Sequence, residues 1–307
     1  MLEYYLTKTG GNKLMMKKII SLLMMITMIL ALVACGNKGD EETASQPKTE
    51  DQFKTEEQSK TEEQSKEEDK SQGESDLAYV EGNGKLIIGY TDYAPMNYTD
   101  DSGTFTGFDT ELATIVCEKL GLEPEFVEIN WDTKEVELNA KSIDTIWNGM
   151  TISEDLKATM EITEPYIKNA QVVVVKEGTN YTDTTSLIDM SVAAEQGSAG
   201  EKTLKADENL KQASYVPKAL QTEALLEVKA GTADAAVLDL TLAKTMTGEG
   251  TNYEDIIIVD HLVEESYGVA FRKGSDICEE VNKIFDELVE DGTMETLADK
   301  YGLELAD

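Results

Sequence analysis

Short apolar runs separated by polar and amphipathic stretches recur along the chain from about residue 84 to its end. Such runs predict buried strands at 85–90, 125–129, 171–175, 191–194, 235–238 and 267–271. Between the first two, Leu112, Val116 and Leu120 fall on one face of a helix that Asp109 is predicted to cap. Strands that alternate with helices predict an α/β fold with short crossovers. Further helices are predicted at 222–230, 276–290 and 293–301.

The segment 143–175 combines a strand, a polar loop and a second strand. Its first apolar run is predicted to end at Asn148-Gly149, and Glu154 then begins a short helix that Pro165 stops. A strand end beside Gly, Thr and Ser leaves backbone N–H groups and hydroxyls free to bind a small polar molecule. An ordinary strand-to-helix turn explains the same local pattern equally well.

The N-terminal part has the pattern of an export signal. Two lysines precede an apolar run at 19–33, which is too short for a comfortable membrane span. Cys35 directly follows the small residue Ala34, an arrangement that resembles a bacterial lipobox. We therefore predict that residues 1–35 are a signal peptide with a lipobox. Lipidated Cys35 would then anchor the protein to the bacterial cell membrane, outside the cytoplasm. The alternative is a cleavage site with an incidental cysteine.

Residues 36–79 are predicted to form a disordered acidic linker. The hexad KTEEQS occurs twice in succession at 54–65, and Phe53 is almost the only apolar residue nearby. Such a segment cannot bury enough apolar surface to offset the entropy lost on ordering it. We expect the linker to hold the folded part away from the membrane.

The chain is strongly acidic, with a formal net charge of −34. From Tyr79 onward, 17 lysine and arginine residues stand against 46 acidic residues, so most of the excess acid belongs to the folded part. This charge argues against nucleic acid as a partner, because phosphates would be repelled. It also argues mildly against a strongly anionic ligand.

Signals for catalysis or metal binding are weak. His261 is the only histidine, so the sequence offers no convincing histidine-based metal site or Ser–His–Asp set. We expect no metal, no cofactor and no catalytic residue. The neighbouring acids Glu264 and Glu265 are interpreted as solvated surface residues. Cys117 and Cys278 are interpreted as two separate buried thiols in preference to a disulfide, which the compartment would also permit.

Two motifs, in order, carry a family resemblance. The first is GFDTEL at 107–112, followed by apolar residues at helical spacing. The second is GMTIS at 149–153, followed by Pro165-Tyr166. From about residue 84 to 302, the chain resembles the extracytoplasmic solute-binding proteins of family 3, the receptors of ABC importers for polar amino acids. The resemblance implies a two-lobed, periplasmic-binding-protein-like fold of type II, with two open sheets joined by a two-strand hinge.

In that fold the chain visits one lobe, crosses to the other and returns. The resemblance therefore implies a first lobe at 80–170 and 266–307, and a second lobe at 172–262. The crossings would lie at 169–174 and 263–269. Ligand would lie between the lobes, at the strand ends where open α/β sheets bind their ligands.

The resemblance also assigns roles in the cleft. It places Trp131 over the ligand, pairs Asp239 with the ligand's α-ammonium, and gives the ligand's carboxylate to the helix N-terminus at Ser198. The alternative for Trp131 is a core residue, and from the residues alone Asp239 would be interpreted as a helix N-cap. The expected ligand-binding residues are Asp92, Tyr93, Trp131, Asn148, Gly149, Met150, Thr151, Gln196, Ser198, Ala199 and Asp239.

The chain departs from the family pattern at Leu156. Family members commonly carry an arginine there, which holds the α-carboxylate with two parallel hydrogen bonds. The only arginine of the whole sequence is Arg272, which follows the last strand and is interpreted as structural. Three explanations are open: a nearby lysine substitutes, the helix N-terminus holds the carboxylate alone, or the ligand lacks a free α-carboxylate.

The sequence thus predicts a monomeric, lipid-anchored receptor that captures a polar amino acid or a close relative and delivers it to an ABC permease. Two alternatives are retained. One is a dehydratase-like enzyme on the same scaffold, for which Asp92, Glu195 and Asp239 are the candidate acids and bases. The other is a sensor that reports the ligand to a membrane signalling partner.

Overall fold

The computed structural model describes residues 75–307. The predicted signal peptide, Cys35 and the linker up to residue 74 lie outside these residues. Helix α3 (Asp76–Asn83) opens the described part, so residues 76–79, which were predicted to belong to the linker, are helical. Ser75 caps this helix, since its hydroxyl oxygen accepts a hydrogen bond from the backbone N–H of Ala78.

The first lobe is built on a sheet whose first three strands are parallel. Its strands are β1 (Lys85–Tyr90), β4 (Glu123–Glu128), β5 (Thr145–Thr151), β6 (Met160–Ile162) and the last part of β11 (Ile256–Arg272). β1 lies between β4 and β5 and runs parallel to both, while β11 runs antiparallel to β5 and β6. A separate hairpin pairs β2 (Tyr98–Thr99) with β3 (Phe105–Thr106).

The second lobe repeats this mixture of parallel and antiparallel pairing. Its strands are β7 (Ile167–Lys176), β8 (Ser191–Glu195), β9 (Ser214–Lys218), β10 (Ala235–Asp239) and the first part of β11. β8 lies between β9 and β10 and is parallel to both, whereas β10 is antiparallel to β7. The apolar residues of β7 and β10 are almost fully buried, which suits central strands covered on both faces.

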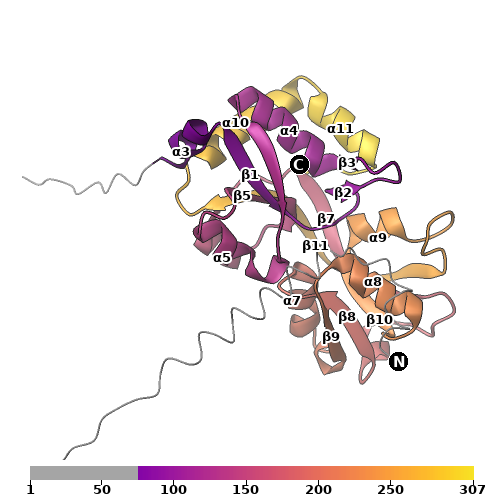
Figure 1. The fold of residues 1–307 in the computed structure, drawn as a ribbon. Helices are drawn as coiled ribbons and strands as arrows, with labels where there is room; N and C mark the ends of the chain where they lie inside the picture. Colours follow the sequence, from indigo (N-terminus) through magenta and orange to yellow (C-terminus); the bar gives the residue numbers. More distant parts are fainter. Residues whose placement is uncertain (1–74) are drawn as a thin grey trace, which may run out of the picture. The chain divides into compact units, whose positions relative to one another are not determined.

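β7 and β11 run through both lobes side by side. They pair antiparallel from Ile256 opposite Lys176 to Tyr267 opposite Ile167, so hydrogen bonding continues from one lobe's sheet to the other's. Within this ladder Asn169 lies opposite Glu265. The two strands are therefore the structural connection between the lobes (Figure 1). Residues 262–265 of β11 line the cleft described below.

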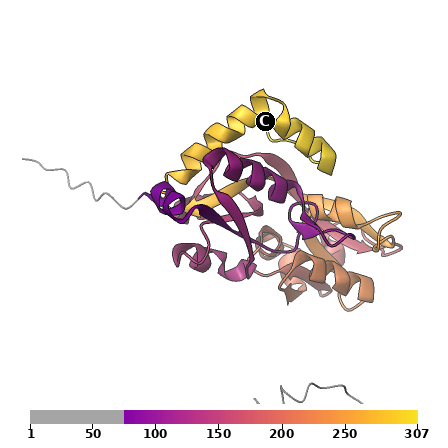
Figure 2. The same cartoon turned by 45° about the horizontal axis from the view of Figure 1, so that its top comes forward.

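Helices cover both sheets. They are α4 (Phe108–Leu120), α5 (Lys134–Asn139), α6 (Glu154–Thr159), α7 (Ala199–Ala206), α8 (Gln221–Ala230), α9 (Leu240–Met246), α10 (Ile277–Glu290) and α11 (Thr293–Tyr301), with 3₁₀ turns at Trp131–Thr133, Thr184–Leu187 and Leu210–Gln212. Figures 1 and 2 show α4, α10 and α11 together on one side of the first lobe. In the second lobe, the apolar residues of α8 and α9 belong to one hydrophobic cluster. Leu204 of α7 belongs to a second hydrophobic cluster.

The predicted end of a strand at Gly149 is wrong. β5 does not end at Asn148-Gly149 but continues to Thr151. Gly149 has a φ of 55°, and the pairing of β5 with β11 changes register nearby. The strand is therefore irregular at this position but does not end there. A Cβ at this position would lie 2.8 Å from Cε1 of Tyr93, which leaves room for glycine alone.

Asp109 does not cap α4, contrary to the prediction. Gly107 occupies the N-cap position, and the fully buried Asp109 carboxylate accepts hydrogen bonds from the Gly149 N–H (2.6 Å) and the Tyr166 hydroxyl (2.8 Å). α6 also ends earlier than predicted, at Thr159, because β6 follows it directly.

Arg272 has a structural role, as predicted. Its guanidinium donates to Asp76, Asp144 and the carbonyl of Ile143, which ties α3 to the first lobe. Cys117 and Cys278 are both free and buried, as predicted. Among residues 75–307, no helix combines the length and the apolar character needed to cross a bilayer.

Candidate functional site

A cleft of about 1110 Å³ opens at the carboxyl ends of strands from both lobes. Thr91 and Tyr93 follow β1, Trp131 follows β4, and Glu195 and Asp239 are the last residues of β8 and β10. This is the place where open α/β sheets bind ligands. The volume is at the upper end of the range for small-molecule sites.

Most of the predicted ligand-binding residues line this cleft. Asp92 and Gln196 do not: both side chains are exposed, and the Gln196 amide donates to the Asp132 carboxylate at 2.9 Å. Those that the structure brings together are Tyr93, Trp131, Asn148, Gly149, Met150, Thr151, Ser198, Ala199 and Asp239.

Trp131 forms one wall of the cleft, and the buried side chain of Lys134 lies beside it. The side chain of Asn130 accepts from the Asp132 N–H and so fixes the turn that Trp131 begins. The Lys134 ammonium lies 4.8 Å from the centre of the Trp131 ring and donates to the carbonyls of Trp131 (3.1 Å) and Gly197 (2.8 Å). Burial lowers the pKa of Lys134.

Asn148 and Gly149 line the cleft, but their hydrogen-bonding groups are bonded to other residues of the protein. The Asn148 amide oxygen accepts from the N–H and hydroxyl of Thr91, and its nitrogen donates to the Thr91 carbonyl and to Asn97. The Gly149 N–H donates to Asp109. These groups therefore hold β1 and β5 in place and are not free donors for a ligand, contrary to the expectation for this loop.

Asp239 is held by a set of buried amides. Its carboxylate accepts from Asn169 (3.2 Å), from Gln221 (2.6 Å) and from Gln171. Burial raises its pKa, and the three amides oppose that rise because they stabilise the charged form. Its backbone N–H donates to Gln221 in turn, and its side chain makes no capping bond to α9. Asp239 thus occupies the N-cap position of α9, as the alternative predicted, but its carboxylate belongs to the amide set and does not cap the helix.

Glu265 lies in the cleft as a second acid, so its interpretation as a solvated surface residue is wrong. Its Oε1 accepts from Thr151 (2.8 Å), Asn169 (2.6 Å) and Gln171 (2.8 Å). Burial and, secondly, the charge of Asp239 raise the pKa of Glu265 to about 7. Its neighbour Glu264 is exposed, as predicted.

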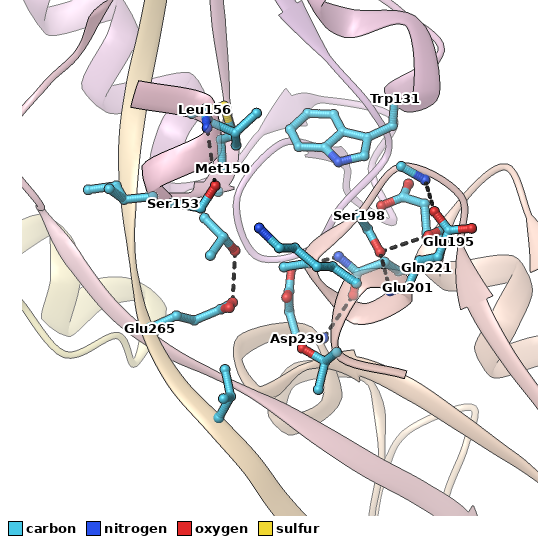
Figure 3. Close-up of a pocket in the computed structure, with 18 of the residues that line it drawn as sticks. Trp131, Met150, Ser153, Leu156, Glu195, Ser198, Glu201, Gln221, Asp239 and Glu265 are labelled. Atoms are coloured by element: carbon cyan, nitrogen blue, oxygen red, sulfur yellow. Dashed lines mark hydrogen bonds between the residues drawn. The ribbon is translucent and has the colours of Figure 1, made fainter. Parts of the chain in front are cut away.

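Glu195 is a third acid and the most isolated one. Its side chain is 3 % exposed, and no group of residues 75–307 donates a hydrogen bond to its carboxylate. Burial and the charge of Asp239 raise its pKa well above the usual range, and the positive charge of Lys134 opposes that rise. Figure 3 shows Glu195 and Glu265 on opposite sides of Asp239.

The N-terminus of α7 is capped by its own residues. The Ser198 hydroxyl accepts from the Glu201 N–H (3.1 Å) and donates to the Glu195 carbonyl (2.7 Å). The Glu201 carboxylate reaches back to the Gly197 N–H (2.8 Å). This reciprocal arrangement is a capping box, and it places a carboxylate at the point where the sequence predicted a seat for the ligand's carboxylate.

The two lobes meet across the mouth of the cleft. Lys202 of α7 forms an ion pair with Asp155 of α6, and the Gln196–Asp132 bond joins the same two lobes. Gly197 has a φ of 73°, and a Cβ there would lie 2.7 Å from the Asp132 Cα. The lobes are thus in close contact at this point.

Leu156 lines the cleft at the position of the family's arginine and packs with the apolar cluster of the first lobe. Two further polar residues of the site were not predicted, Lys134 and Gln221. Gln221 opens α8 directly after a polar loop, and Lys134 follows the Asn-Trp-Asp turn, yet neither pattern by itself indicates a buried residue. Within residues 75–307, no three His, Cys, Asp or Glu side chains are grouped so as to hold a metal ion.

Comparisons with known proteins agree with this geometry. The family model of the bacterial extracellular solute-binding proteins, family 3, matches residues 86–304. The chain is 26% identical over 234 residues to the arginine-binding extracellular protein ArtP of Bacillus subtilis, which covers 75% of this chain and 90% of that protein.

Two solved structures extend the comparison. A substrate-binding protein of an ABC uptake transporter from Streptococcus pneumoniae, with bound histidine, has a TM-score of 0.68 and 26% identity, over 74% of this chain and 96% of that one. An ancestral amino acid-binding protein, described as a precursor of cyclohexadienyl dehydratase, has a TM-score of 0.67 and 31% identity, over 74% of this chain and 99% of that one.

Proposed function

Because the chain belongs to the bacterial extracellular solute-binding proteins of family 3, we propose that it captures an amino acid or a close relative in the cleft between its lobes and delivers it to an ABC permease. The observation that carries the proposal is the buried, amide-held carboxylate of Asp239 in a cleft walled by Trp131. An ionised carboxylate and an aromatic face together suit an ammonium group on an aliphatic stem.

The cleft supports binding and release. Tyr93, Thr151 and Met150 join Trp131 and Asp239 on its walls, which gives the mixture of apolar surface and few polar groups that small-molecule sites use. β7 and β11 connect the lobes and would act as the hinge when the cleft opens and closes.

We also propose that the protein does not transform its ligand. The enzyme alternative needs a general acid or base, and of its three candidates Asp92 lies outside the cleft while Glu195 and Asp239 line it. The relatives described above bind amino acids, although one is a dehydratase precursor. Ligand recovered unchanged after prolonged incubation with the protein is the expected result, and a converted product would establish the enzyme.

A lipid anchor at Cys35 completes the proposal. Proteins of this family work outside the cytoplasm, and the apolar run before Ala34-Cys35 supports export and lipidation of this one. We propose that the protein acts as a monomer beside its permease, with the acidic linker giving it reach.

The test of the transport function has two parts. The purified protein is screened by thermal shift against the twenty amino acids and their amine relatives; a ligand at a hundred times its dissociation constant adds roughly 2.7 kcal/mol to the free energy of unfolding. Deletion of the gene from its host should then abolish uptake of that ligand. Stabilisation without loss of uptake would favour the sensor alternative, and no stabilisation by any compound would refute the proposal.

A further inference from the structure

The cleft carries more negative charge than its own cations neutralise. The lysines that line it are Lys134, Lys202 and Lys205, and the last two are already paired with Asp155 and Glu201. Three carboxylates remain inside, those of Glu195, Asp239 and Glu265, and Lys134 is the lysine buried with them. Buried acids this close to one another favour their neutral, protonated forms, and a bound cation would stabilise them as anions.

Glu195 points to a ligand most directly. It is an acidic residue that is 3 % exposed, lines the cleft and receives no hydrogen bond on its carboxyl group from residues 75–307. Buried polar groups are almost always hydrogen-bonded in folded proteins, so an acid without a donor in a binding cleft is a place where a donor arrives from outside. A ligand ammonium supplies both the donor and the charge.

Glu265 offers a second free acceptor. All three of its hydrogen bonds end on Oε1, which leaves Oε2 without a donor among the described residues. Asp239 shares the donors Asn169 and Gln171 with it, so the two carboxylates form one negatively charged end of the cleft. Glu195 ends β8, the strand that pairs with β10, and lies on the other side of Asp239 from Glu265 (Figure 3).

Several groups that could hold a ligand carboxylate are already bonded within the protein. The Lys134 ammonium donates to two backbone carbonyls. The Gly197 N–H is taken by Glu201, whose charge occupies the first turn of α7. Leu156 contributes an apolar surface at the wall, and Arg272 is bonded to Asp76 and Asp144. A carboxylate entering the cleft would meet like charges and find few free donors.

We propose, building on the proposed function, that the cleft is specific for a small dication without a carboxylate, the class of amine formed when a basic amino acid is decarboxylated. One cationic group binds Asp239 and Glu265, the other binds Glu195, and the aliphatic stem lies along the face of Trp131. The amide set around Asp239 holds the first carboxylate pair in position, and Glu195 selects ligands with a second charge.

Matched ligand pairs test this proposal without any substitution. Arginine and agmatine, lysine and cadaverine, ornithine and putrescine, and histidine and histamine differ within each pair only by the carboxylate. Calorimetric titration of the full chain should show that the amine of at least one pair binds about tenfold or more tighter than its amino acid. The carboxylate of the amino acid would lie close to the acids of the cleft, and this repulsion lowers its affinity. Putrescine should also bind tighter than butylamine, which lacks the second charge.

The outcomes distinguish a failure of the dication proposal from a failure of the proposed transport function. Tighter binding of the amino acid in every pair overturns the dication proposal and leaves the transport function standing. Equal binding of putrescine and butylamine overturns the part assigned to Glu195. Silence from all eight compounds and from the other amino acids overturns both proposals together.

Two substitutions add a matched control. Glu195→Gln should weaken putrescine binding about tenfold and leave butylamine binding nearly unchanged. Glu208→Gln removes the same charge from an exposed position in the second lobe, where Glu208 pairs with Lys211, and should change neither affinity. An equal loss for putrescine and butylamine in the Glu195 variant would contradict the proposal.

Discussion

Asp239 and Glu265 accept hydrogen bonds from the same two side-chain amides, those of Asn169 and Gln171. The acids come from β10 and β11 and the amides from β7, so three strands meet in this one network. Burial is the main cause that raises the pKa of Glu265, and the charge of Asp239, which the shared donors hold nearby, adds to that rise. The network therefore favours a cation over an anion at this end of the cleft.

Replacing Asp239 by asparagine should weaken ligand binding by about ten- to a hundredfold, since a hydrogen bond to a charged group contributes about 1.5–3 kcal/mol. The shape of the side chain is kept, and the protein should stay folded. Titration calorimetry with a circular-dichroism check measures both. Asp299→Asn, on the exposed face of α11, is the control and should bind normally. An unchanged dissociation constant for Asp239→Asn would remove Asp239 from the site.

The aromatic wall gives a graded prediction. Trp131→Ala should reduce affinity about tenfold, because a cation or stem over an indole face is stabilised by about 0.5–2 kcal/mol. Trp131→Phe keeps an aromatic ring and should lose less. The order of affinities, wild type above Phe above Ala, is measured by titration. Equal affinity in all three proteins would show that Trp131 only fills the core.

The ligand-free protein should lose stability as the pH rises from about 4.5 to 7. The pKa of Glu265 is raised to about 7, so in this interval the folded protein keeps a proton that the unfolded chain releases. Rising pH then favours the unfolded state. Asp109, whose pKa burial also raises to about 7, contributes in the same direction. Melting temperatures across this range should fall by a few degrees.

Glu265→Gln should flatten that decline in part, since Asp109 remains. Binding of a cation should conversely be stronger at pH 8 than at pH 5, because the acids are then ionised. A pH profile of melting temperature with and without ligand measures both effects. Identical profiles for the wild type and Glu265→Gln would contradict the buried, proton-binding state of Glu265.

Leu156→Arg should shift the preference of the cleft toward amino acids. Leu156 lines the cleft, and a guanidinium there would offer two parallel hydrogen bonds to a carboxylate. We expect the affinity for an amino acid to rise relative to its decarboxylated amine by about tenfold. Leu156→Met, which adds no charge, is the control. No change in the ratio for the arginine variant would mean that the ligand does not reach this wall.

Cys35→Ser should release the protein from the membrane. A thioether lipid requires the thiol, and one apolar run that is cleaved away cannot hold the mature chain. Fractionation of cells and labelling with a fatty-acid analogue measure the anchor, with Cys117→Ser as a control because its thiol is buried. Membrane retention of the Cys35 variant would point to another mode of attachment.

The sequence predicted those parts of the fold that local pattern determines. The strand 85–90 and the helix 293–301 have the predicted bounds, because an apolar run or a capped, periodic stretch defines each of them. β9 and the first half of β11 were missed. Ser214–Lys218 contains a proline, which disfavours a strand, and the residues from Ile256 to Glu265 show no regular alternation of buried and exposed positions.

The site was harder to predict than the fold for a related reason. Trp131 and Asp239 were identified through motif order, and both line the cleft. Glu195 ends β8 and Glu265 lies in β11, and both are buried by tertiary contacts within the cleft, which no local pattern records. Asn148 shows the opposite error: its amide is polar and near the cleft, yet tertiary contacts with Thr91 and Asn97 use every one of its hydrogen-bonding groups.

The position of Glu265 opposite Asn169 in the β7–β11 ladder also bears on how this protein can evolve. These two residues belong at once to the connection between the lobes and to the acid network, so a substitution at either alters the mechanics and the chemistry together. Trp131, Leu156 and Glu195 lie outside that ladder. Divergence toward new ligands should therefore accumulate at these three positions first, while the crossing strands drift slowly.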